Sequence, residues 1–266
     1  MPNLTFQNSD FISSRTDLPI IQNVADVLPS TRFESDSYGH WAFYGDNPLK
    51  DKVNGRLLTL QTNAAIQPVY TNQGVALTNA KGSALMSDLG DTVTQNITAV
   101  YVAQTSGLGL YLLGPSLTNS SSTTESGFGV YAGTDSQDSN KPKIYMNLKP
   151  KKADKTGGFE NIKTNQEVQF TTPFLVAISV DKAKKTAMLY VLKGDNDSFI
   201  STSYTASYED SLKKIAVGNA YYTAAESGTK TTFAETILYD KALTLNQLKA
   251  VAHRCKLRLA TKNIII

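Results

Sequence analysis

The carboxylates Glu235 and Asp240, in the run FAETILYD, come nearest to the spacing that sugar-cleaving chemistry requires. Glycoside hydrolases use a pair of carboxyl groups beside the bond that breaks, about 5 to 5.5 Å apart in the retaining class. Successive side chains of a strand point to opposite faces, so this odd spacing places the two carboxylates on opposite faces. We therefore expect Glu235 to satisfy a buried polar contact and Asp240 to shape the turn that follows.

The two histidines, His40 and His253, and the single cysteine, Cys255, are the side chains available for nucleophilic or zinc chemistry. None of them lies in a Gly-x-Ser-x-Gly motif or a His-Glu-x-x-His motif, and the chain has no phosphate-binding Gly-Lys-Ser/Thr loop. Cys255 falls on the apolar stripe of a predicted helix, so we expect a small core residue. The sequence thus predicts a protein that is not an enzyme and holds no zinc.

Aspartates in predicted turns are the candidate ligands for a calcium ion. Calcium takes oxygen ligands that can come from separate loops, so no contiguous motif is needed. The candidates are Asp46, Asp51, Asp195 and Asp197. Each is also explained as an ordinary turn residue. The sequence requires no cofactor, and calcium stays open as the alternative.

Tyrosines are the candidate platforms for a glycan, because binding sites combine aromatic faces with a few polar groups. Tyr221 and Tyr222 are adjacent, so in a strand one of them faces outward. Tyr131 is expected on the same rim. The chain has 13 tyrosines, so the alternative for each of the three is a tyrosine that lines a half-buried sheet.

Composition and charge describe an ordinary folded protein. The chain has 266 residues, 41% of them hydrophobic and 18% charged, which is near the average of globular domains. Its longest apolar runs are under ten residues, whereas a membrane-spanning helix needs roughly 20, so we expect no membrane insertion. The net charge of +3 does not indicate nucleic acid. The N-terminal sequence lacks the pattern of a secretory signal, so synthesis in the cytoplasm is expected.

Lysines are concentrated in the stretch KPKIYMNLKPKKADK, residues 141–155. Such a run could follow an anionic polysaccharide or nucleic acid. It is also typical of an edge hairpin, in which lysines prevent sheets from aggregating, and we favour that interpretation.

Short apolar runs bounded by Gly, Asn, Asp and Ser predict strands, and their number and spacing are typical of a sandwich or barrel. In FLVAISVD the residues from Phe174 to Val180 alternate, which predicts one buried face. The turn residues in 194–198 predict a hairpin. The strand-like runs are residues 56–62, 97–104, 108–114, 127–133, 143–149, 167–172, 173–181, 186–194, 213–220 and 233–240.

A helix is predicted over residues 244–260. Thr244 and Gln247 make a capping box, and apolar residues follow at helical spacing from Leu245 to Leu259. We expect the apolar stripe to pack on a sheet. Residues 1–38 lack sustained periodicity and are predicted to form an extended N-terminal arm, with one domain over residues 39–266.

Three stretches resemble the concanavalin A-like and laminin-G-like jelly rolls, including those of bacteriophage virion proteins. They are HWAFYGDNPLKDKVNGRLLTL with its Trp41, FAETILYDKALTLNQLKAV, and GVALTNAKGSALMS, which is similar to a strand pair of the family. The resemblance covers residues 40–262. It implies two packed antiparallel sheets, a face or rim for glycan or protein recognition, and often a calcium ion.

The predicted function is that of a non-catalytic virion structural protein, such as a tail fibre or decoration protein. It is expected to bind a bacterial surface glycan or a neighbouring virion subunit, and to assemble as a homo-oligomer in the phage particle. One alternative is an assembly protein without glycan binding. Another is an enzyme that degrades polysaccharides. These assignments follow from the resemblance, since a fold does not fix a function.

Overall fold

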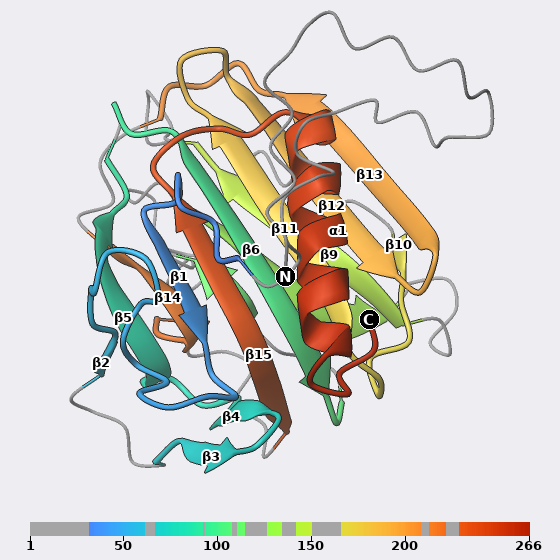
Figure 1. Ribbon diagram of the computed structural model, residues 1–266. Coiled ribbons are helices and arrows are strands. Elements are labelled where there is room, and N and C mark those ends of the chain that lie inside the picture. The colour runs from blue at the N-terminus through green and yellow to red at the C-terminus, as the bar shows by residue number, and fades with distance from the viewer. Residues whose placement is uncertain are drawn as a thin grey trace, which may run out of the picture.

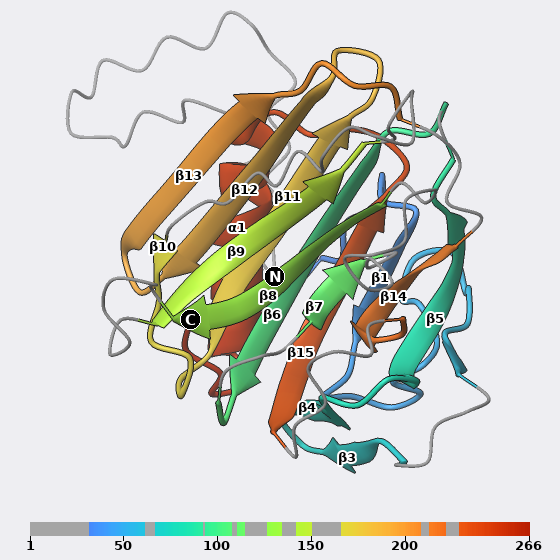
Figure 2. The same cartoon turned by 180° about the vertical axis from the view of Figure 1, so that it is seen from behind.

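The computed structural model describes residues 32–61, 67–92, 94–107, 111–114, 127–134, 142–150, 166–208, 213–221 and 229–266. Within them, two antiparallel sheets pack face to face, and a helix lies on the outer face of one sheet (Figures 1 and 2). The predicted all-β sandwich with a C-terminal helix is confirmed. No helix in these ranges is both long and apolar enough to cross a membrane.

The helix-side sheet, named for the helix that covers it, runs from β13 at one edge to β3 at the other. Its β1 pairs with β15 beside β4. The strands, in spatial order, are β13 (Asn196–Ser203), β12 (Thr186–Lys193), β11 (Phe174–Asp181), β6 (Ile97–Thr105), β15 (Lys230–Tyr239), β4 (Gly74–Thr78) and β3 (Val69–Thr71), with β1 (Gly39–Ala42) off this path.

The far sheet, on the other side of the core, runs from β10 to β2. Its strands, in spatial order, are β10 (Gln166–Glu167), β9 (Pro142–Lys149), β8 (Gly127–Thr134), β7 (Tyr111–Gly114), β14 (Lys214–Asn219), β5 (Ser83–Gly90) and β2 (Thr59–Leu60).

The central strands β6 and β11 of the helix-side sheet are buried on both faces, which explains why their sequences are mostly apolar. Phe174 and Val176 of β11 point into the core between the sheets, as the alternation predicts. Leu175 and Ala177 point to the opposite face, into a second core beneath the helix. Trp41 is fully buried between the sheets. A middle layer of this kind needs apolar residues at successive positions.

Helix α1 (Leu245–Ala260) begins as the sequence predicts. The Thr244 side chain accepts a hydrogen bond from the Gln247 backbone, and the Gln247 side chain accepts one from the Thr244 N–H. The apolar stripe, which includes Leu248 and Leu259, is buried on the sheet.

The chain leaves α1 through a left-handed residue. Asn263 has φ 59°, the Asn263 N–H donates to Ala260 O, and the Ile264 N–H donates to Leu259 O. These are the two hydrogen bonds of a Schellman motif. The motif turns residues 263–266 back toward the sheet.

The strand assignment differs from expectation in several details, and the predicted strand over residues 56–62 is reduced to β2. The predicted strand pair GVALTNAKGSALMS forms β4 and β5, but β4 pairs with β15 and β5 pairs with β14, in opposite sheets. The predicted strand over residues 167–172 is reduced to β10. The predicted hairpin does form, between β12 and β13, with Gly194 at φ 62° in its turn.

The lysine-rich run contributes β9, which lies next to the edge strand β10 and is not itself the edge. The other end of the chain is described only from Arg32 onward. The predicted arm, residues 1–38, therefore lies mostly outside the described residues, and its boundary stays a prediction.

Candidate functional site

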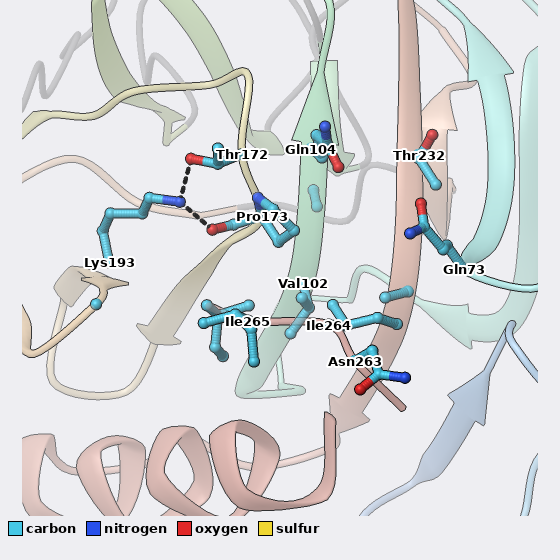
Figure 3. A pocket seen from close by; sticks show the side chains of 14 residues that line it. Gln73, Val102, Gln104, Thr172, Pro173, Lys193, Thr232, Asn263, Ile264 and Ile265 are labelled. Atoms are coloured by element: carbon cyan, nitrogen blue, oxygen red, sulfur yellow. Dashed lines mark hydrogen bonds between the residues drawn. The ribbon is translucent and has the colours of Figure 1, made fainter. Parts of the chain in front are cut away.

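A pocket of about 540 Å³ opens on the outer face of the helix-side sheet, beside the end of α1 (Figure 3). Ligand sites usually have volumes of roughly 300 to 1,000 Å³. Val102 of β6 and Ala234 of β15 contribute to the sheet side of the pocket, and residues 263–266 line it next to the helix. The β11 entry and the end of β12 supply Thr172, Pro173 and Lys193.

The pocket exists because the helix ends before it has covered the sheet. The tail after the Schellman motif anchors itself through Ile264 and Ile266, which are buried, while Ile265 between them is 66% exposed. On the sheet, β15 shifts register between Phe233 and Glu235, and the residue at this shift is the small Ala234. Residues 263–266 therefore form one side of the pocket, and the part of the sheet beside them is not covered by the helix.

Lys193 is the only charged side chain among the residues that line the pocket. Its ammonium donates hydrogen bonds to the Thr172 hydroxyl and the Pro173 carbonyl (Figure 3). Both acceptors are neutral, and within the described residues no carboxylate forms an ion pair with it. Partial burial lowers the pKa of this lysine. An ammonium without a counter-ion at an apolar opening favours an anionic or strongly polar ligand.

Neutral polar groups line the rest of the pocket. The Gln104 amide donates to Thr171 O at 2.6 Å, which leaves its own oxygen as an acceptor. Gln73, Thr232 and Asn263 add two amides and a hydroxyl around the apolar residues (Figure 3). This set can donate and accept hydrogen bonds, and the lining contains no carboxylate or histidine side chain for proton transfer.

Glu235 and Arg258 form an ion pair that is buried away from solvent. Arg258 donates to both carboxylate oxygens of Glu235 at 2.8 Å, and the two side chains are 3% and 1% exposed. Burial by itself would raise the pKa of Glu235, but hydrogen bonds from Arg258 and His40 hold it well below its usual range. The predicted buried contact of Glu235 is confirmed, and Asp240 is exposed beyond the end of β15.

His40 and Cys255 belong to the same cluster. The His40 Nδ1 accepts the Glu34 N–H at 3.0 Å, so Nε2 carries the proton and faces Glu235 at 3.5 Å. Burial raises the pKa of the Cys255 thiol well above its usual value. Cys255 is fully buried, as predicted. These residues connect residues 32–40 and the helix to β15 through buried contacts.

Residues just before β1 also bind to the helix. Arg254 of α1 donates to both carboxylate oxygens of Glu34, at 2.9 and 2.6 Å. Arg258 donates to Arg32 O at 2.8 Å. Glu34 is 5% exposed, so the part of the predicted arm that the structure describes packs against the helix.

The four candidate calcium ligands are not brought together. Asp46 and Asp51 lie between β1 and β2. Asp195 and Asp197 lie in the β12–β13 hairpin, at the opposite edge of the helix-side sheet (Figure 1). Within the described ranges, no three or more His, Cys, Asp or Glu side chains are grouped to hold a metal. The four residues occupy two separate turns, and a calcium role for any of them stays a prediction.

Each of these turns uses its aspartates for structure. The buried Asp51 carboxylate accepts the N–H groups of His40, Val53 and Asn54 at 2.6 to 2.9 Å. In the hairpin, Asp195 pairs with Lys256 and Asp197 with Lys249. The Asp46 carbonyl accepts a hydrogen bond from Lys52.

Tyr131 and Tyr221 both lie on the outer face of the far sheet, with β7 and β14 running between β8 and β5 there. Tyr131 stacks on Tyr145 with ring centroids 4.9 Å apart, and Tyr221 packs on Ala216 and Met86. The Tyr221 hydroxyl is engaged by the Lys214 backbone. Tyr222 lies outside the described residues. The glycan role of these tyrosines stays a prediction.

Sequence reasoning did not find the pocket. No motif marks it, because its residues come from six separated segments: the β3–β4 turn, β6, the entry to β11, the end of β12, β15 and the tail. The one local signal was Lys193, placed directly before the turn glycine of the hairpin. The apolar Ile264, Ile265 and Ile266 at the other end of the domain gave no indication of which strand they contact.

No family model matches the chain, and no curated protein matches it. Among solved structures, the chain is similar to domain 4 of AbnA, an extracellular GH43 arabinanase from Geobacillus stearothermophilus solved with arabinotriose. The identity is 15%, the TM-score is 0.53, and 83% of this chain and 100% of that one are covered.

Two other similar structures belong to longer chains. One is Trypanosoma rangeli sialidase, with 13% identity, a TM-score of 0.54, and coverage of 86% of this chain and 33% of that one. The other is the binding domain of Paraclostridial Mosquitocidal Protein 1, with 13% identity, a TM-score of 0.50, and coverage of 81% and 51%. At such identities the likeness establishes the β-sandwich fold.

Proposed function

We propose that the protein is a non-catalytic saccharide-binding sandwich and that the pocket beside Lys193 holds the sugar. The proposal rests on the composition of this pocket, in which three amides, two hydroxyls and one ammonium surround an apolar patch. Sugars present hydroxyl groups at their edges and C–H groups on their faces, so they need both kinds of contact. A few placed polar groups over an apolar surface are typical of ligand sites.

The comparisons support the class of ligand. The arabinanase domain of similar fold was solved with arabinotriose, so this architecture accommodates saccharides in at least one similar protein. A fold by itself does not fix a function, and for this reason the proposal depends on the pocket.

The absence of acids from the pocket lining supports binding over hydrolysis. Retaining and inverting glycosidases need two carboxyl groups beside the bond. The lining includes no aspartate or glutamate side chain, and Glu235, the acid predicted to be buried, is paired with Arg258 away from solvent. The alternative of a polysaccharide-degrading enzyme is therefore the weaker one.

The biological setting that we propose is the bacteriophage particle, where the sandwich would attach to a bacterial surface glycan or to neighbouring virion subunits. This proposal rests on the resemblance of residues 40–60 and 233–251 to virion jelly rolls. In this setting the protein is made in the host cytoplasm and then incorporated into the particle. Mass spectrometry of purified particles should therefore detect it. Its loss from particles during purification would contradict this setting.

A binding assay tests the pocket. The purified protein is titrated with a panel of bacterial surface oligosaccharides, with and without calcium, and released sugar is measured in parallel. We expect saturable binding without released sugar. Replacing Lys193 with methionine should weaken binding at least about tenfold, because a hydrogen bond from a charged group contributes about 1.5 to 3 kcal/mol.

Lys184→Met is the matched control, since this lysine is 80% exposed in the β11–β12 turn, outside the pocket lining. If the Lys193→Met protein bound the saccharide as tightly as the unaltered protein, the assignment of this pocket as the saccharide site would be contradicted. If Tyr131→Ala then abolished binding, the site would lie on the outer face of the far sheet. Released sugar would overturn the non-catalytic assignment.

A further inference from the structure

Strand β13 is the terminal strand of the helix-side sheet and forms its edge (Figures 1 and 2). It pairs with β12 over all eight of its residues, from Asn196 opposite Lys193 to Ser203 opposite Thr186, with no shift of register. Within the described residues, no strand pairs with its other side. A regular edge of this length presents a row of backbone N–H and C=O groups to a further strand.

The side chains of β13 do not protect this edge. Natural edge strands usually carry lysine, proline or a bulge that discourages further pairing. The strand NDSFISTS has none of these, and its large residues Phe199 and Ile200 are 48% and 38% exposed. Its one charged residue, Asp197, is already paired with Lys249 at 2.9 Å.

We propose that two copies of the chain pair through β13, antiparallel and edge to edge, to form one continuous sheet. A two-fold axis perpendicular to the sheet places the central residue opposite its own copy, as an isologous contact requires. With Phe199 or Ile200 at the centre, apolar side chains meet at the axis. Asp197 then faces a serine of the partner subunit, Ser201 of the partner subunit in one register and Ser203 of the partner subunit in the other.

This self-complementarity is why a second copy is the occupant and not an unrelated strand. Antiparallel pairing requires that no like charges face each other, and the strand meets that condition with itself. Phe199 lies opposite Tyr190, whose ring belongs to the core beneath the helix, and Ile200 lies opposite Leu189 of the inter-sheet core. With Phe199 at the centre, the pairing therefore extends the apolar layer beneath the helix, and with Ile200 at the centre it extends the layer between the sheets.

Light scattering coupled to size-exclusion chromatography tests the proposal on the full chain. We expect a mass of twice 28.9 kDa at micromolar concentrations. Phe199→Lys should give a monomer, because it places two ammonium groups at or next to the axis. Leu57→Lys, at another exposed position (57% exposed), is the control and should remain a dimer.

Cysteine cross-linking locates the contact independently of any loss of folding. The single natural cysteine, Cys255, is buried, so an introduced thiol is the reactive one. Residues directly opposite in antiparallel strands have Cβ atoms roughly 4.5 to 5.5 Å apart, which is close to disulfide geometry. Phe199→Cys or Ile200→Cys should form a disulfide-linked dimer, and Ser203→Cys should not.

A monomeric unaltered chain would overturn the proposal, as would a dimer that persists in the Phe199→Lys protein or that cross-links at neither central position. Each outcome is independent of saccharide binding, because Phe199 and Ile200 do not line the pocket. The experiments therefore distinguish a failure of the dimer proposal from a failure of the proposed saccharide site.

Discussion

At the residue scale, the ion pair of Glu235 and Arg258 joins β15 to helix α1, and both of its charges are buried. The odd spacing from Asp240 predicted that the two carboxylates do not face each other, and Glu235 is buried as expected while Asp240 is exposed. The partner could not be predicted, because Arg258 is 23 positions away, on an element whose contact with β15 no local pattern reveals. The same limit applied to Asp51, whose place in a turn was predicted but whose four backbone partners were not.

Replacing Arg258 with methionine should lower the free energy of unfolding by about 3 to 5 kcal/mol, since it leaves the Glu235 carboxylate buried without its partner. Chemical denaturation at pH 7 measures this. Glu235→Gln with Arg258→Met is the control, because it removes both charges and should recover part of the loss. An effect below about 1 kcal/mol for Arg258→Met would contradict the assigned role.

The lowered pKa of Glu235 also predicts a pH dependence. Because the folded-state pKa lies below the unfolded value, usually about 4.3, the unfolded chain takes up the proton first as pH falls. The contribution of Glu235 to stability is thus complete at neutral pH and is lost as pH falls through and below that value. Denaturation curves at pH 7 and pH 3 should show a smaller loss for Glu235→Gln than for the unaltered protein. An equal loss would contradict this linkage.

At the scale of elements, the helix and most strands were readable because their signals are local. The capping box and the apolar stripe defined α1 to within a residue, and alternation identified the core face of β11. The pairing of strands could not be predicted from the sequence. For example, β4 and β5 are adjacent in sequence but lie in opposite sheets. Pairing depends on distant segments, β15 and β14, which compete for each strand.

The end of α1 gives a prediction at this scale. Asn263 adopts φ 59°, a left-handed conformation that Asn and Gly tolerate better than other residues. Asn263→Ala should lower the free energy of unfolding by about 1 kcal/mol, whereas Asn263→Gly should leave it nearly unchanged, as measured by thermal or chemical denaturation. Equal effects of the two substitutions would show that the left-handed turn does not contribute.

At the scale of the whole molecule, the sandwich was predictable from the number and spacing of strands, while the pocket was not. The pocket forms where the tail folds back on the helix-side sheet beside Lys193, a product of the tertiary fold that no single element encodes. It also lies on the helix-side face, near the hairpin that ends in β13. A two-fold axis perpendicular to the sheet would keep this face on the same side in both copies.

A dimer paired through β13 should therefore present two saccharide pockets toward one surface, a prediction that rests on both proposals. On a dense immobilised polysaccharide, the second contact becomes intramolecular, and such avidity can exceed a single affinity by about 10² to 10⁴-fold. Surface plasmon resonance should show much slower dissociation for the unaltered chain than for the monomeric Phe199→Lys protein. With a soluble oligosaccharide that reaches one pocket, calorimetry should give the same affinity for both. Equal dissociation from the dense surface would mean that the two pockets do not act together, even if the dimer and the pocket each exist.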